Sequence, residues 1–199
     1  MNKIAHIFSW ILSPMLMPTY AVFTALWITI LAIYPVSVRW NVTLMIWLIT
    51  CILPILSFLL LYKLKVISNP GLNNQHERSI PYIITMVCYL GASYYLYHIH
   101  APQWLWMFMV GGAIAAIVSF IVNIWWKISG HGAGIGGYIA LLFRIAVDGL
   151  SLYDIWPFIS VAILLAGILG TSRIILKCHT LGQVLAGIAN GFLWVFILS

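Results

Sequence analysis

Long apolar stretches separated by short polar segments dominate the chain. We distinguish seven of them, at 15–34, 42–62, 81–97, 104–126, 131–147, 155–170 and 179–198. A helix needs about 20 apolar residues to cross a bilayer, whereas an outer-membrane barrel would show alternating segments of about ten. The fifth and sixth stretches are short for a full crossing. The pattern therefore predicts an all-α polytopic transmembrane helical bundle with six to seven spans.

The start of the chain is also apolar. It carries Lys3 but has no small-residue cleavage site, so we expect an uncleaved first span rather than a signal peptide. Proline removes a backbone donor, so Pro14, Pro18 and Pro54 predict kinks or an interfacial entry helix. No linker or soluble insert interrupts the sequence, which predicts a single integral-membrane domain over residues 1–199.

Composition excludes the soluble classes. The chain is 64% apolar and only 6% charged, against about 45–50% and 25% for a soluble domain. Nine Lys and Arg face three acids, but the cations are scattered between apolar stretches. Nucleic acid is therefore excluded as a partner, and an anionic substrate or anionic membrane lipids fit better. Cys51, Cys88 and Cys178 form no disulfide framework.

Three polar segments, at 63–78, 127–130 and 171–179, are separated by even numbers of predicted spans. An even number of crossings returns the chain to the same membrane face. That face would collect the ionisable residues Arg78, Lys127, His131, Arg173, Lys177 and His179. Ionisable groups near a membrane usually face a cavity, and guanidinium, ammonium and imidazole groups together favour a phosphate site.

Several of these features also have a structural interpretation. The glycines Gly130, Gly132, Gly134, Gly136 and Gly137 could open a helix N-terminus to an anion, but small residues more often serve helix packing. Lysines at span ends are usually anchors, and the i, i+4 spacing of Arg144 and Asp148 favours a structural ion pair. His98 and His100 are expected at the interface, with a metal pair as the alternative.

Two motifs carry a resemblance to a known family. Residues 128–131 read Ile-Ser-Gly-His, and residues 172–179 begin with Ser-Arg and end in His after five residues. They resemble the second and third signatures of the type 2 phosphatidic acid phosphatase (PAP2) superfamily, in its integral-membrane branch. Residues 77–81, Glu-Arg-Ser-Ile-Pro, are similar to a degenerate first signature.

The resemblance implies a helical bundle that hydrolyses phosphate monoesters or diphosphates without a metal or other cofactor. By position, His179 would be the nucleophile that forms a phosphohistidine, and His131 would protonate the leaving group. The phosphoryl oxygens would be held by Arg78, Arg173, Ser129 and the Gly130 amide.

The chain departs from the family pattern at two positions. The first-signature Lys would fall at Gly71, and we hypothesise that Lys127 supplies the missing charge. The Asp four residues after the nucleophile is replaced by Gln183, which lies one helical turn from His179. Its amide oxygen would orient the ring and fix its tautomer without adding a negative charge.

The sequence thus predicts a lipid phosphatase acting on a lipid phosphate or diphosphate in the bacterial inner membrane. The alternative is a membrane protein that binds or transports a lipid phosphate without turnover. Phosphatidate, phosphatidylglycerol phosphate, polyprenyl diphosphate and a lipid A phosphate all fit. The lysines place the site in the cytoplasm by the positive-inside rule, whereas the family resemblance favours the outer face, so both sides remain open.

Overall fold

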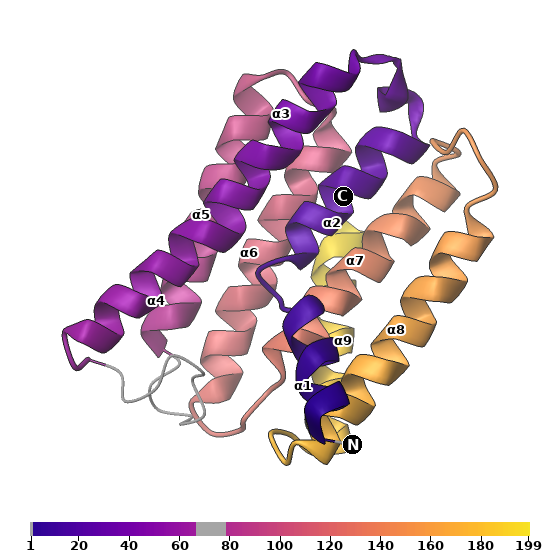
Figure 1. Ribbon diagram of the computed structural model, residues 1–199. Helices are drawn as coiled ribbons and strands as arrows, with labels where there is room; N and C mark the ends of the chain where they lie inside the picture. The colour runs from indigo at the N-terminus through magenta and orange to yellow at the C-terminus, as the bar shows by residue number, and fades with distance from the viewer. Residues whose placement is uncertain (1, 67–78) are drawn as a thin grey trace.

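The computed structural model describes residues 2–66 and 79–199, and every regular element in these ranges is a helix (Figure 1). The elements are α1 (Asn2–Ile11), α2 (Met17–Ile28), η1 (Ile30–Ile33), α3 (Val36–Trp47), η2 (Leu48–Ile52), α4 (Leu53–Lys63), α5 (Ser79–His98), α6 (Gln103–Asn123), α7 (Gly130–Val147), α8 (Trp156–Ile175) and α9 (Leu181–Leu198). The prediction of an all-α bundle is confirmed.

Five helices in the described ranges are long and apolar enough to cross a membrane, as expected of an integral membrane protein. They are Val36–Lys63, Gln103–Asn123, Gly130–Val147, Trp156–Ile175 and Leu181–Leu198. The first of these is continuous through α3, η2 and α4, because the helix widens into the π-helical turn η2 ahead of Pro54 instead of breaking. The count of six to seven spans stays a prediction.

The prediction of one span over 15–34 is wrong. Helix α2 has 12 residues, about 18 Å of helix, and it ends at Ile28. The chain then pairs with the α7–α8 connection through a bridge between Thr29 and Ser151. The N-terminal segment is likewise a separate short helix, α1, which ends before Pro14 and is not the start of a span.

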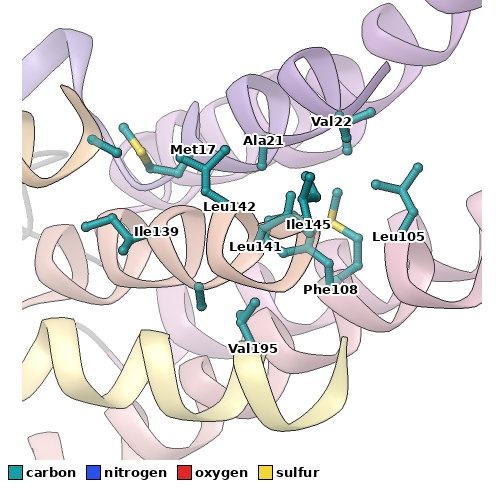
Figure 2. Close-up of a cluster of buried hydrophobic side chains, with 14 of the residues drawn as sticks. Met17, Ala21, Val22, Leu105, Phe108, Ile139, Leu141, Leu142, Ile145 and Val195 are labelled. Atoms are coloured by element: carbon teal, nitrogen blue, oxygen red, sulfur yellow. The ribbon is translucent and has the colours of Figure 1, made fainter. Parts of the chain in front are cut away.

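Helix α7 lies at the centre of the bundle (Figure 1). Figure 2 shows its Leu142 beside Met17 and Ala21 of α2, with Val195 of α9 on the other side of the helix. Leu141 and Ile145 of α7 are fully buried. The residues of α7 that follow His131 are therefore packed between the surrounding helices.

Glycines bring α7 and α9 into close contact. A Cβ atom at Gly136 would overlap the Ile188 carbonyl, and one at Gly191 would overlap the Ala133 carbonyl. A Cβ at Gly132 would lie 2.7 Å from the Val184 oxygen. The packing interpretation is therefore right for these glycines, since any larger residue would separate the two backbones.

Different helix termini lie at the two ends of the bundle. The C-terminal ends of α4, α6 and α8 and the N-terminal ends of α1, α7 and α9 lie at one end (Figure 1). The α7–α8 connection and the start of α3 lie at the other end (Figure 1). The parity argument is confirmed for Lys127, His131, Arg173 and His179, which all lie at or beside the first group of helix ends.

Candidate phosphate site

A cavity of about 610 Å³ opens among α1, α4, α5, α7 and α8 at this end of the bundle. Its polar lining includes Ser9, Tyr82, His131, Arg173, Cys178 and His179. Gly130 also lines it, whereas Ile55 and Phe58 of α4 form an apolar side. No Asp or Glu lines the part of the cavity formed by residues 2–66 and 79–199. The described walls are therefore positive and suited to an anion with an apolar substituent.

The Ser-Gly-His motif forms the start of α7. Ser129 is the N-cap, and its hydroxyl accepts a hydrogen bond from the Gly132 amide at 3.2 Å. Its own amide donates to the Gln183 carbonyl at 3.2 Å, and the residue is completely buried. Ser129 thus fixes α7 on α9 and does not line the cavity, whereas Gly130, expected beside it, does.

Arg173 lies in the last turn of α8. The first residues of the polar segment 171–179 are helical as far as Ile175, and the Ser172 hydroxyl donates to the Ile168 carbonyl one turn earlier at 2.7 Å. The Arg173 Nη1 atom donates to the Ser9 hydroxyl at 2.6 Å. The guanidinium group is therefore held at the cavity wall by a neutral partner from α1.

His179 is buried just before α9, and its Nδ1 atom faces two oxygens. The Lys127 main-chain carbonyl lies at 3.2 Å and the Gln183 Oε1 atom at 3.3 Å. Gln183 also closes a capping box with Thr180, whose amide donates to the same Oε1 atom at 3.1 Å. Because the Thr180 amide is a donor, the Gln183 atom must be its oxygen, and both neighbours of Nδ1 are acceptors.

This arrangement assigns the tautomer of His179. A ring nitrogen facing two acceptors carries the proton, so the neutral ring is the Nδ1–H form and Nε2 is the basic nitrogen. The predicted contact between Gln183 and the ring is confirmed. Lys127 contributes its backbone oxygen to that orientation, and its side chain is not among the described cavity walls. A phosphate role for the Lys127 ammonium group stays a prediction.

His131, in the first turn of α7, contacts the same serine as Arg173. Its Nε2 atom lies 3.1 Å from the Ser9 carbonyl oxygen and 3.4 Å from the Ser9 hydroxyl. Sequence reasoning missed Ser9. The available signal was weak: Ser9 is a polar residue in line with Ala5 and Leu12, which are the buried apolar positions at its helical spacing.

Arg78, the remaining predicted ligand, lies outside the described residues, as does Gly71. The structure thus brings together His131, Arg173, His179, Gly130 and Gln183 from the predicted set. It places Ser129 and the Lys127 carbonyl behind them as supports.

His6 of α1 also lines the cavity, whereas three other ionisable residues lie away from it. Arg144 and Asp148 form the predicted ion pair at the end of α7, with Nε and Oδ2 2.9 Å apart. His98 stacks on Tyr94 with ring centroids 6.0 Å apart at the end of α5. Among the residues that the structure describes, no three His, Cys, Asp or Glu side chains gather as a metal site would require.

A smaller apolar cavity of about 100 Å³ adjoins the first and shares Pro14, Tyr82, Thr85 and Gly130 with it. Its other walls come from α2, α5, α6, α7 and α9 and include Tyr89, Phe108 and Val195. The two cavities therefore share a wall, and the smaller one lies on the side of the apolar interior of the bundle.

Comparisons with known proteins add no relative. No protein-family profile, no curated protein and no solved structure matches this chain.

Proposed function

We propose that this protein is a PAP2-like membrane phosphatase that hydrolyses a lipid phosphate or diphosphate through a phosphohistidine intermediate. The observation that carries the proposal is the shared cavity of His131, Arg173 and His179, with Nδ1 of His179 held by two acceptors. A neutral histidine with a basic Nε2 is the form that can attack phosphorus.

The proposed reaction has two steps. In the first, Nε2 of His179 bonds to phosphorus, the bond from phosphorus to the leaving oxygen breaks, and protonated His131 gives that oxygen a proton. In the second, water attacks the phosphohistidine while His131 takes a proton from it, which releases phosphate and restores both histidines. Arg173, and Arg78 by the motif resemblance, would offset the charge on the transferring oxygens.

The apolar surroundings support a lipid substrate. A phosphate group beside Arg173 in the larger cavity would leave its substituent near Ile55 and Phe58 or in the adjoining smaller cavity. Burial of apolar surface stabilises a complex by about 25 cal/mol per Å², so a hydrocarbon tail bound there would increase the affinity for the substrate. We propose a bundle of six to seven spans in the bacterial inner membrane, acting without a metal on one of the four lipids named above.

The test is phosphate release by purified protein from a panel of these lipid phosphates. His179→Ala should abolish release, because it removes the proposed nucleophile whose Nδ1 atom is held by two acceptors. His98→Ala is the matched control, since it removes a histidine at the other end of the bundle, and it should keep wild-type activity. Binding of the lipids without any release by the wild type would favour the non-catalytic alternative.

A further inference from the structure

Helix α1 lies outside the three motifs, yet it supplies the contact that joins two of them. Ser9 presents two oxygens to the cavity wall. Its hydroxyl accepts from Arg173 at 2.6 Å, and its carbonyl oxygen lies 3.1 Å from Nε2 of His131. One residue therefore connects the cation of α8 to the imidazole of α7.

The chemistry of these contacts is selective. A backbone carbonyl oxygen only accepts hydrogen bonds, so its contact with Nε2 requires a proton on that nitrogen. This is the opposite tautomer from His179, whose protonated nitrogen is Nδ1. His131 and His179 are thus held with opposite ring nitrogens protonated. In His179 the basic nitrogen is Nε2, which would attack phosphorus, and in His131 it is Nδ1, which would exchange a proton with the leaving group.

Packing holds Ser9 in place. Ala5 and Leu12 on the same side of α1 are 3% and 5% exposed, and Ser9 itself is 7% exposed. The Tyr20 hydroxyl donates to the Ile11 carbonyl at 3.1 Å, which secures the end of α1 to α2. A buried hydroxyl between two functional groups is costly to keep unless its hydrogen bonds are satisfied, and here Arg173 satisfies one of them.

We propose that Ser9 is a positioning residue of the phosphate site. Its hydroxyl sets the position of the Arg173 guanidinium group, and its carbonyl oxygen keeps His131 in the Nε2–H form. The inference rests on the proposed function for its catalytic meaning, but each of the two contacts is testable without turnover.

The kinetic test compares Ser9→Ala with Ser9→Thr. Alanine removes the hydroxyl and should lower kcat/KM about tenfold, the scale of one hydrogen bond to a charged group, with KM rising because Arg173 is released. Threonine keeps the hydroxyl and should retain most of the activity. Ser57→Ala is the control, because the Ser57 hydroxyl bonds only within its own helix, to the Leu53 carbonyl at 2.9 Å. Ser9→Ala activity equal to or above the wild type would overturn the proposal, because Ser9 would then compete with the substrate for Arg173.

Two measurements separate this inference from the proposed function. Binding of inorganic phosphate, followed by ³¹P NMR, should be about tenfold weaker in Ser9→Ala than in the wild type, whether or not lipids are hydrolysed. ¹⁵N NMR of the histidines at alkaline pH should show His131 as Nε2–H and His179 as Nδ1–H, with signals assigned from His131→Gln and His179→Gln. Unchanged phosphate binding, or an Nδ1–H form of His131 in the wild type, would refute the positioning role. Absent lipid hydrolysis with both results as expected would refute only the phosphatase.

Discussion

The two ends of α7 carry charged or titratable groups in contrasting settings. At its C-terminal end, Arg144 pairs with Asp148 one turn away, and both side chains are about one-third exposed. At its N-terminal end, His131 and Arg173 both contact Ser9, which lies 122 and 164 residues before them in the chain. The first arrangement neutralises a cation locally. In the second, an uncharged serine contacts both the guanidinium group and the imidazole at the wall of the cavity.

Acids follow the same division. The two described acids, Asp148 and Asp154, both lie at the end of the bundle opposite the cavity. Carboxylates beside Arg173 would compete with a phosphate for the guanidinium group. The acids of residues 2–66 and 79–199 thus lie away from the cavity, and the following predictions test this contrast between the two ends.

The largest expected difference is between the two arginines. Arg173→Ala should cost about 2–4 kcal/mol in transition-state stabilisation, seen as a large fall in kcat/KM for lipid phosphate hydrolysis. Arg144→Ala should leave kcat/KM unchanged and lower the free energy of unfolding by at most about 0.5 kcal/mol, since a helical ion pair that is about one-third exposed contributes little. Comparable losses of activity in the two variants would remove the distinction between the ends.

Two glycines, one near each end of α7, allow the same comparison for backbone packing. A Cβ at Gly187 would overlap the Ser129 carbonyl, so Gly187→Ala should push the start of α7 from α9. We expect about 2–3 kcal/mol of destabilisation, as for overpacking, together with reduced activity because His131 moves. Gly149, at the other end, has φ +62° and nothing near its Cβ position. Gly149→Ala should cost about 1–2 kcal/mol through the left-handed backbone alone and keep the activity of the folded protein. Thermal unfolding in detergent measures both.

The sequence predicts those parts of the structure whose partners are close along the chain. The Arg144–Asp148 pair and the contact of Gln183 with His179 both span four residues, and helical geometry alone brings them together. The helices of membrane-spanning length are also predictable, because the length of an apolar stretch is a local property of the sequence. The shared end of the motifs also follows, because it depends only on counting crossings.

Other features could not be read from the sequence. The Lys127 carbonyl orients His179, but every residue has a carbonyl, so its position depends on the turn after α6. Ser9 reaches Arg173 only through the packing of α1 on α8, which no local pattern encodes. The break after Ile28 likewise depends on the distant partner Ser151.

A smaller effect is expected at Gln183. Gln183→Leu removes one acceptor of Nδ1 and half of the capping box, but the Lys127 carbonyl remains, so we expect a fall in kcat of about tenfold without abolition. Gln183→Asp should keep or raise kcat, because a carboxylate stabilises the imidazolium that forms on His179. Gln183→Glu is the length-matched companion, since Glu also completes a capping box. Loss of all activity in Gln183→Asp would contradict this account of the amide.

The smallest expected effect is that of a chelator. The described walls of the cavity contain histidines and Arg173 but no carboxylate, and a divalent cation such as Mg²⁺ or Ca²⁺ prefers oxygen ligands of that kind. Arg173 would also repel a cation bound beside it. We therefore expect release of phosphate in EDTA at the wild-type rate, measured beside a metal-dependent phosphatase whose activity EDTA removes. If EDTA abolished the activity and Mg²⁺ restored it, charge neutralisation at the cavity end would belong to a metal ion instead of Arg173. The contrast between the two ends of α7 would then no longer explain where the anion binds.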